Sequence, residues 1–227
     1  MTYLSESIPQ LVLPLIIIFI YLTILVTIAE VLNRSIADDP ELTRKVVHIG
    51  SGNVILLAWW LKINTEVIVA AAIIASIIAL SSYFLPILPS INSVGRKSLG
   101  TLFYAISIGV LTQLFWRDYP QYTAIGILVM AWGDGMAAII GQRFGKHTYR
   151  VFDINKSWEG SAAMAIATFI VTSMTLFASQ SNLGQALFVA AIVATLATAL
   201  EAFSKLGIDN LTVPLASALI CYGCYQI

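Results

Sequence analysis

The sequence predicts an all-α integral membrane protein, a polytopic bundle of about seven or eight transmembrane helices that forms a single domain over residues 1–227. Of these residues, 59% are hydrophobic and only 11% are charged, whereas soluble domains carry about 25% charged residues. The mean hydropathy is +0.87. Several apolar stretches also approach the ~20 residues that a helix needs to cross a bilayer. The lipid bilayer is therefore the first partner that we expect.

Eight apolar runs, separated by polar segments, are the expected spans. The first run lacks the basic flank of a signal peptide, so we expect a retained first helix within residues 1–39. The second and fourth runs are short, and we expect their helices to begin in the polar segments before them. The expected spans cover residues 8–32, 48–61, 67–85, 101–115, 121–140, 161–178, 186–201 and 211–226.

The placement of positive charge predicts the orientation of these spans. Of the 12 Lys and Arg residues, ten lie in the first, third, fifth and seventh connections, and the even connections hold only Lys62 and Arg117. Because Lys and Arg favour the cytoplasmic side, we expect the odd connections to face the cytoplasm and both termini to lie outside. The ten residues are Arg34, Arg44, Lys45, Arg96, Lys97, Arg143, Lys146, Arg150, Lys156 and Lys205. Nearly all unusual polar residues lie in the same connections, so we expect the functional site on the cytoplasmic side.

Asp134 is the most informative single residue, because it lies near the end of a long apolar stretch. A carboxylate at that depth costs at least ~2.5 kcal/mol even on the most lenient insertion scale, and such residues are functional by default. Gly133 and Gly135 flank it, which permits the backbone to unwind or to approach another group closely. We expect Asp134 to hold Mg²⁺ between phosphate oxygens, although a carboxylate that only packs between helices is the alternative.

The residues after Asp134 are suited to binding phosphate. Gly141 and Gly145 allow close backbone approach, and Arg143 and Lys146 supply positive charge. The run Gly141-x-x-x-Gly-Lys is similar to a P-loop, but its spacing is one residue short, it lacks the Ser/Thr, and it follows a membrane span instead of a strand. We therefore reject a P-loop and keep only the expectation of a phosphate contact.

A second cluster lies at the entrance to the span 48–61. Asp39 and Pro40 predict the start of a helix, with a side-chain cap followed by proline in the first turn. Arg44 and His48 are then at i and i+4 on one face, with Lys45 beside them. These groups could bind phosphate. Alternatively, the cations extend to the interface while His48 packs between helices.

A third cluster, around Arg96, precedes the span 101–115. Glycines, hydroxyl groups and two cations before a helix are typical of an anion-binding nest. An ordinary loop that fixes the topology would have the same composition.

A fourth cluster enters the span 161–178. Lys156 could hold a phosphate, and Glu159 could hold a metal or a cation. Ser157 could also cap the next helix, in which case Glu159 is a first-turn acid that the helix dipole favours.

Two further acids, Glu201 and Asp209, lie at the end of one expected span and the start of the next. With Asp134 and Glu159 they place four acids on one side of the membrane, among ten cations. Carboxylates, Mg²⁺ and cations are the groups that phosphoryl or nucleotidyl transfer requires. By contrast, Cys221 and Cys224 lack enough partner ligands for a metal site, so we expect two buried thiols on one helix face.

Taken together, these segments resemble the polyprenol kinase family, which includes phytol kinases, dolichol kinases and a CTP-dependent diacylglycerol kinase, and which is related to the phosphatidate cytidylyltransferases. The resemblance covers most of the chain from residue 40, and its most specific part runs from Asp134 to Gly160. The short chain looks closest to the phytol kinases. The matching segments are Arg44-Lys-x-x-His48, Gly133-Asp134 to Gly145-Lys146, Lys156-Ser-x-Glu-Gly160 and Asp209-Asn-x-x-x-Pro214.

The resemblance implies that residues 40–227 form a catalytic core that phosphorylates a long-chain isoprenoid alcohol, with CTP as the typical donor and with Mg²⁺. The implied catalytic or metal-binding residues are Asp134, Lys156, Glu159 and Asp209. The implied contacts to nucleotide phosphates, or their structural supports, are Arg44, Lys45, His48, Lys146 and Asn210. We add Glu201 to the expected metal ligands, and Arg96, Gly141, Gly145 and Ser157 to the expected nucleotide contacts.

The expected partners are thus the bilayer, an isoprenoid alcohol and a nucleoside triphosphate, and no nucleic-acid polymer. The sequence leaves open which alcohol is used, whether CTP is the donor, and whether Asp134 or Asp209 accepts the hydroxyl proton. It also leaves open the oligomeric state and the membrane, which could be a bacterial or cyanobacterial plasma membrane, a thylakoid or a plastid membrane.

Two other functions remain as alternatives. A cytidylyltransferase would release a CDP-lipid and pyrophosphate, but the fuller acidic signature expected near the C-terminus is absent from the sequence. A transporter would distribute acids through the depth of the membrane, whereas here the acids gather on one side.

Overall fold

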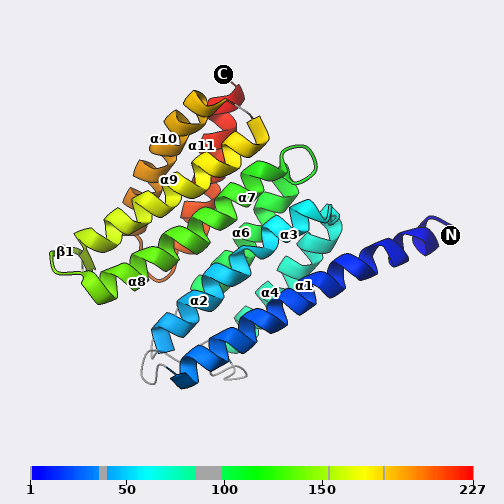
Figure 1. Ribbon diagram of the computed structural model, residues 1–227, viewed down its shortest axis with the longest axis horizontal. Helices are drawn as coiled ribbons and strands as arrows, with labels where there is room; N and C mark the ends of the chain where they lie inside the picture. Colours follow the sequence, from blue (N-terminus) through cyan, green and yellow to red (C-terminus); the bar gives the residue numbers. More distant parts are fainter. Residues whose placement is uncertain (1, 36–39, 85–98, 153, 181, 227) are drawn as a thin grey trace.

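The computed structural model describes residues 2–35, 40–84, 99–152, 154–180 and 182–226, and it consists of α-helices with one small hairpin (Figure 1). Arg96, one of the expected nucleotide contacts, lies outside the described residues. The elements are α1 (Thr2–Ser35), α2 (Pro40–Gly52), α3 (Val54–Trp60), α4 (Thr65–Phe84), α6 (Gly100–Phe115), α7 (Pro120–Leu128), the π-helical turn η1 (Val129–Asp134), α8 (Gly135–Phe144), β1 (Thr148–Val151), β2 (Ile154–Ser157), α9 (Trp158–Gln180), α10 (Leu183–Ala202) and α11 (Asp209–Gln226).

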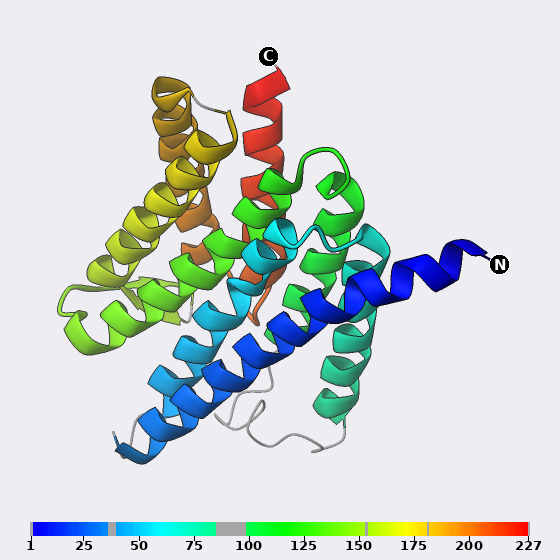
Figure 2. The ribbon, with the colours of Figure 1, turned by 45° about the vertical axis from the view of Figure 1, so that its right-hand side comes forward.

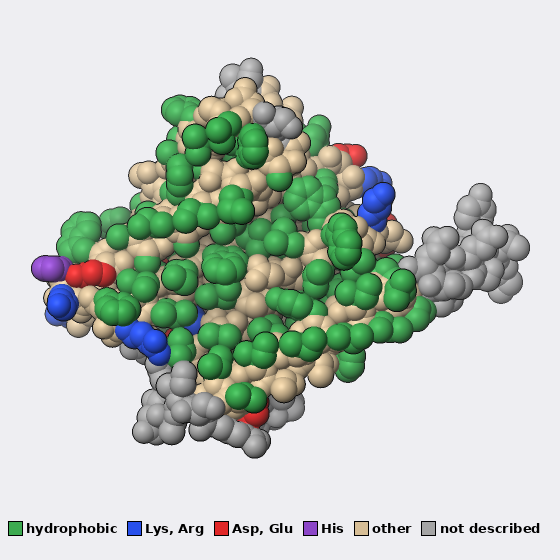
Figure 3. Space-filling model, viewed as in Figure 1, with side chains coloured by type: hydrophobic (Ala, Val, Ile, Leu, Met, Phe, Trp, Pro, Cys, Tyr) green, Lys and Arg blue, Asp and Glu red, His purple; other side chains and the backbone are tan. Residues whose placement is uncertain are grey.

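The expected all-α membrane bundle is confirmed. Within the described residues, five helical stretches are long and apolar enough to cross a membrane. A sixth, Gly100–Phe115, is apolar but shorter. On the face shown in Figure 3, hydrophobic side chains cover the middle, and charged side chains lie toward the ends. The five long stretches are Leu11–Leu32, Thr65–Ser82, Pro120–Phe144, Trp158–Ser179 and Leu183–Ala202.

Two of the eight expected spans depart from simple apolar helices. The span 48–61 is divided at Asn53 into α2 and α3, and α2 begins at Pro40 in the preceding polar segment, as expected. The last span is the helix α11, which carries Pro214 inside it. Near its end the two cysteines are free thiols, with Cys221 buried and Cys224 partly buried.

The stretch formed by α7, η1 and α8 is the centre of the bundle. Most of Pro120–Phe144 is buried, whereas Ala29 is the only buried residue within Leu11–Leu32 of α1. In Figures 1 and 2, α1 lies at the edge of the molecule, and α7 and α8 run through its middle, with α9, α10 and α11 on the far side. The hydroxyl of Tyr21 in α1 donates a hydrogen bond to the carbonyl of Gly50 in α2 over 2.8 Å, which ties the outer helix to the bundle.

Two local features, a π-helical turn and a β-hairpin, differ from what the sequence predicted. The backbone around Gly133 and Gly135 does not unwind; it widens into the single π-helical turn η1 and continues as α8. The basic connection after α8 is not a simple loop, because β1 and β2 pair as an antiparallel hairpin with Thr148 opposite Ser157. Their side chains alternate in burial along each strand, as a hairpin that covers a helix end requires.

Close approach of α7 to two neighbouring helices depends on Gly126. A Cβ atom at this position would lie 2.6 Å from Leu111 Cδ1 of α6 and 2.6 Å from the backbone carbonyl oxygen of Pro214 in α11. The carbonyl cannot rotate away as a side chain could. The glycine therefore sets the distance between the central helix and α11.

We expect Gly126→Ala to lower the unfolding free energy by about 1–3 kcal/mol, because overpacking forces helices apart. The matched control is Gly223→Ala in α11, where a Cβ would meet nothing within 4 Å. That control should be neutral or stabilising by up to ~1 kcal/mol, because alanine favours helix. Thermal unfolding in detergent measures both, and equal melting temperatures for the two variants would contradict the close approach.

Candidate active site

A pocket of about 270 Å³ lies where η1 and α8 meet the hairpin, α9 and the end of α10. Three charged residues line it, namely Asp134, Lys156 and Glu201. Most of the remaining lining is small or polar, and it includes three expected nucleotide contacts, Gly141, Gly145 and Ser157. The other lining residues are Ala137, Ala138, Gln142, Thr148, Ile154, Asn155, Gly160 and Ser161.

Asp134, the last residue of η1, is held by two side chains of α2. The ammonium of Lys45 donates a hydrogen bond to Asp134 Oδ2 over 2.5 Å, and His48 Nε2 lies 3.7 Å from the same oxygen. Lys45 is itself buried, at 7% exposure. Lys45 and His48 are at i and i+3 of one helix and so project from the same face. The carboxylate, its cation and the imidazole therefore form one cluster.

Arg44 does not join this cluster, contrary to the face that its i,i+4 spacing with His48 suggested. Its guanidinium turns outward and forms hydrogen bonds with Glu41, with Arg44 Nε 2.9 Å from Glu41 Oε2. The hydrogen bond and the negative charge of Glu41 raise the pKa of Arg44. Lys45, one residue later, occupies the inward position.

The glycines beside Asp134 let two helices pack against it. A side chain at Gly133 would meet Met164 and Thr168 of α9, and a side chain at Gly135 would meet Ile49 of α2. The junction between α2 and α3 is fixed as well, because the indole of Trp132 donates a hydrogen bond to Asn53 Oδ1 over 2.9 Å. Asp134 is thus enclosed by α2 on one side and α9 on the other.

Lys156 and Glu201 form the second charged pair of the pocket. The ammonium of Lys156, on β2, donates hydrogen bonds to the carboxylate of Glu201 and, over 2.6 Å, to its backbone carbonyl. Glu201 lies in the last turn of α10 and is buried at 8% exposure. The hairpin is therefore the element that carries Lys156 to the end of α10. Each carboxylate of the pocket has a lysine partner.

Small residues join α8 to α9 beside these pairs. A Cβ at Gly160 would lie 3.0 Å from the carbonyl oxygen of Ala137 and 3.2 Å from Gly141 Cα, so the two helices touch through glycine. Ser157 Oγ accepts a hydrogen bond from the Gly160 amide over 3.1 Å, which confirms the expected cap of α9.

Besides Arg44, Lys45 and His48, four more expected site residues lie outside the lining of this pocket. Glu159 faces His147, whose backbone amide donates to it over 3.2 Å and whose ring Nδ1 lies 2.6 Å from Oε1. Lys146 is exposed after α8. Asp209 and Asn210 begin α11, where Asp209 Oδ1 accepts a hydrogen bond from the Asn210 amide over 3.1 Å.

Asp209 is nevertheless within electrostatic reach of the pocket. Burial raises the pKa of Asp209, and the negative charge of Asp134 raises it further, while Lys156 acts in the opposite direction. Asp209 thus holds its proton more readily than an exposed aspartate does.

The four expected metal ligands do not gather into one centre. Within the part of the chain that the structure describes, no three His, Cys, Asp or Glu side chains are close enough to hold a metal ion by themselves. Asp134 and Glu201 share the pocket, whereas Glu159 and Asp209 are outside its lining. Sequence reasoning also missed Gln142, Thr148 and Asn155, whose only signal was their position within the block from Asp134 to Gly160.

Comparison with known proteins identifies relatives across most of the chain, although no family model and no solved structure matches it. A phytol kinase of Synechocystis sp. is 54% identical over 204 residues, which are 89% of this chain and 88% of that protein. Phytol kinase 1, chloroplastic, of Arabidopsis thaliana is 32% identical over 85% of this chain and 69% of its own length. Farnesol kinase, chloroplastic, of the same plant is 32% identical over 84% of this chain and 67% of its own length. With 54% identity over nearly the whole of this chain and of the Synechocystis protein, and with a pocket built from the segments that carried the resemblance, this chain belongs to the polyprenol kinase family, among the phytol kinases.

Proposed function

We propose that this protein is a phytol kinase that transfers the γ-phosphate of CTP to the hydroxyl of phytol, giving phytyl phosphate and CDP. The observation that carries the proposal is the pocket that brings Asp134, Lys156 and Glu201 beside Gly141 and Gly160, in a chain 54% identical to a protein named as a phytol kinase. Two acids, one lysine and a glycine-lined wall, with Lys45 paired to Asp134 beside them, are groups that phosphoryl transfer uses.

The position of the pocket suits a lipid acceptor. It lies at the end of the bundle formed by the fifth and seventh connections, where the hairpin carries Arg150 and Lys156. We propose that the protein crosses the membrane several times and that this end faces the cytoplasm. The phytyl chain would then lie in lipid or between helices, with its hydroxyl at the interface, and the nucleotide would arrive from water.

The donor set of the pocket fits Mg²⁺. This ion takes oxygen ligands and usually binds through one or two carboxylates, with phosphate oxygens and waters filling its remaining positions. Asp134 and Glu201 supply two carboxylates in one pocket. We propose that they would hold the ion, which would supply charge neutralisation at the β- and γ-phosphates.

Lys156 of the pocket and Lys45 beside it would bind phosphate. Lys45 and Lys156 each contact a carboxylate in the structure, and a lysine side chain can redirect its three donors because its stem is flexible. As the carboxylates take other ligands, the same ammonium groups would turn to phosphate oxygens. The glycines at 141, 145 and 160 would let the backbone approach the same group.

The acceptor oxygen must lose a proton as it attacks. A bond forms between the phytol oxygen and the γ-phosphorus, the bond between that phosphorus and the bridging oxygen breaks, and CDP leaves. We propose that the carboxylate of Asp209 accepts the proton, because its raised pKa brings it closer to neutral pH. Asp134, which is committed to Lys45 and His48, would act on the nucleotide side.

The direct test is a kinase assay in detergent or nanodiscs with γ-labelled CTP or ATP and with phytol, farnesol or geranylgeraniol. We expect label in phytyl phosphate with CTP, and a loss of at least about 100-fold in Asp134→Asn, because the group that positions the phosphates is removed. The same substitution at Asp118, an exposed residue of the turn between α6 and α7, is the control and should keep full activity. Transfer of an α-label with release of pyrophosphate would instead indicate nucleotidyl transfer, and full activity in Asp134→Asn would refute the proposed site.

The two glutamates of the region should differ in their response to Mg²⁺. We expect Glu201→Gln to raise the Mg²⁺ concentration for half-maximal activity about tenfold or more, because one of the proposed ligands is lost. Glu159→Gln should leave this concentration unchanged, since Glu159 faces His147 instead of the pocket. Activity measured against Mg²⁺ concentration decides between them, and the opposite order would move the metal to Glu159.

The rate should depend on pH through Asp209. A carboxyl group with a raised pKa is protonated over a wider acidic range, so kcat should fall as the pH drops through that pKa. In Asp209→Asn we expect a rate at least about 100-fold lower and no such acidic limb. Asp209→Glu should restore part of the rate and the limb. An acidic limb that persists unchanged in Asp209→Asn would assign the proton to another group.

A further inference from the structure

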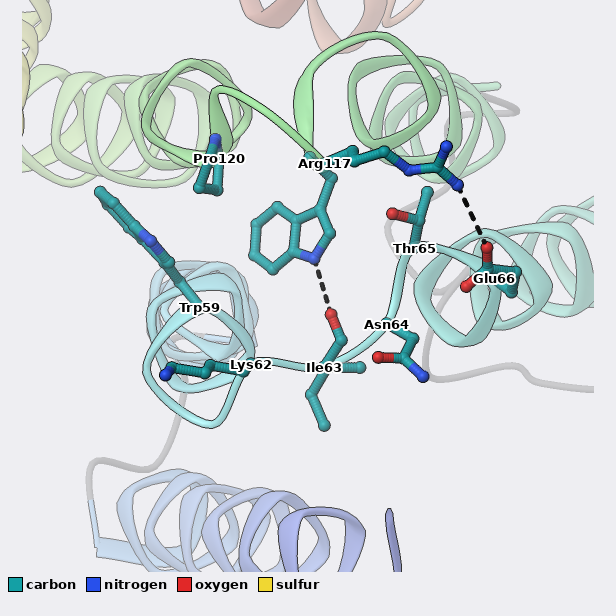
Figure 4. Close-up of a pocket in the computed structure, with 9 residues that line it drawn as sticks. Trp59, Lys62, Ile63, Asn64, Thr65, Glu66, Arg117 and Pro120 are labelled. Carbon is teal, nitrogen blue, oxygen red and sulfur yellow. Dashed lines mark hydrogen bonds and ion pairs between the residues drawn. The ribbon is translucent and has the colours of Figure 1, made fainter. Parts of the chain in front are cut away.

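A second pocket, of about 400 Å³, lies at the opposite end of the bundle from Asp134 (Figure 4). The turn between α3 and α4 forms one wall, and the turn between α6 and α7 forms the other. Its lining includes Pro120, from which α7 and η1 run to Asp134. The distance along that helix is about 20 Å at 1.5 Å per residue. The pocket is therefore separate from the proposed site of phosphoryl transfer.

This pocket holds both cations of the even connections. Lys62 and Arg117 are the two Lys or Arg residues of the even connections, and both line it, although they come from different turns. Arg117 is loosely paired, with its guanidinium 3.7 Å from Glu66 and both side chains exposed. Within the described residues, the Lys62 side chain makes no ion pair or hydrogen bond. One acid faces two cations, so the pocket carries a net positive charge on the side where positive residues are otherwise absent.

The backbone of Lys62 adopts a left-handed conformation at the end of α3. Two backbone hydrogen bonds close the end of α3. The amide of Lys62 donates to the carbonyl of Trp59 over 3.1 Å, and the amide of Ile63 donates to the carbonyl of Ala58 over 2.9 Å. In this type of helix end, the residue at Lys62 adopts a left-handed conformation, and glycine is the usual choice. Lys62 has φ 52°, which costs a residue with a side chain roughly 1–2 kcal/mol. The strain is a cost of having a lysine at this position, and Phe152 and Leu206 bear the same cost elsewhere in the described chain.

Three tryptophans gather at this end of the bundle, and one of them, Trp116, is buried. Trp59 and Trp116 line it, and the indole of Trp116 donates a hydrogen bond to the carbonyl of Ile63 over 2.7 Å, which joins the two turns. Trp60, beside them, is 76% exposed. Trp is enriched where a membrane protein meets the water interface. Figure 4 shows Trp59 and Lys62 on one side and Arg117 with Glu66 on the other.

We propose that this pocket binds the headgroup of an anionic lipid from the leaflet opposite the proposed active site. Phosphate or sulfonate oxygens would contact Lys62 and Arg117, with Arg117 released from its loose pair with Glu66. The tryptophans would cover the glycerol region, and the acyl chains would follow the exposed apolar face of α4, which includes Ile73, Ile74 and Ile77. This role goes beyond phosphoryl transfer and uses none of its residues.

The test uses the full chain in detergent, with added phosphatidylglycerol, phosphatidylcholine or inorganic phosphate, read out by native mass spectrometry and by the melting temperature. We expect phosphatidylglycerol to be retained and to raise the melting temperature, and the other two to do neither. Lys62→Gly should weaken lipid binding about tenfold, which corresponds to the loss of one charge-assisted contact. Without lipid this variant should be at least as stable as the parent, because glycine is unstrained at φ 52°. Arg117→Gln should weaken binding similarly.

Arg150→Gln, which removes an exposed cation at the other end of the bundle, is the matched control and should bind lipid as the parent does. Three outcomes would overturn the proposal. An equal response to phosphatidylcholine would mean that the headgroup charge is irrelevant. An equal response to inorganic phosphate would make the ligand a soluble anion. An equal loss in Arg150→Gln would make the binding a diffuse surface effect.

Discussion

The ion pair between Lys45 and Asp134 is the interaction on which the arrangement of this bundle depends. A lone carboxylate in the apolar centre would be costly, and pairing with a buried cation offsets much of that cost. The pair fixes α2 against η1, with the ammonium 2.5 Å from the carboxylate oxygen. The glycines that flank Asp134 and the bond from Trp132 to Asn53 hold the same junction. Removal of either charge would leave the other buried without a partner.

The pocket repeats this pairing in Lys156 and Glu201. Lys156 in the pocket and Lys45 beside it balance the two acids, so the site is close to neutral and can still accept a polyanion together with a cation. The interactions that stabilise the fold and those that would bind the nucleotide therefore involve the same side chains. A catalytic site of this kind needs no large movement to bind substrate, only the exchange of partners by flexible lysine stems.

The sequence was a good guide to the fold and to part of the site. Hydropathy located the helices, and the cost of burying a charge identified Asp134. Helical spacing suggested that Arg44 and His48 share a face, but it could not decide which of the neighbouring cations points inward, because that depends on where Asp134 lies. The hairpin was missed because its strands have four residues each, too few to show a periodic pattern. Without the hairpin, neither the pairing of Lys156 with Glu201 nor that of Glu159 with His147 could be anticipated.

The π-helical turn has a consequence for the register of the central helix. A turn widened by one residue rotates all that follows by roughly 100° relative to an uninterrupted α-helix. The half of the helix before Val129 is packed on all sides, with residues 121–128 buried, while the half after Asp134 presents Ala137 and Gly141 to the pocket. Deletion of one residue within Val129–Asp134 would restore a regular helix and turn that small-residue face away from α9. The extra residue thus allows one continuous helix to pack against the core in its first half and to present small residues to the pocket in its second half.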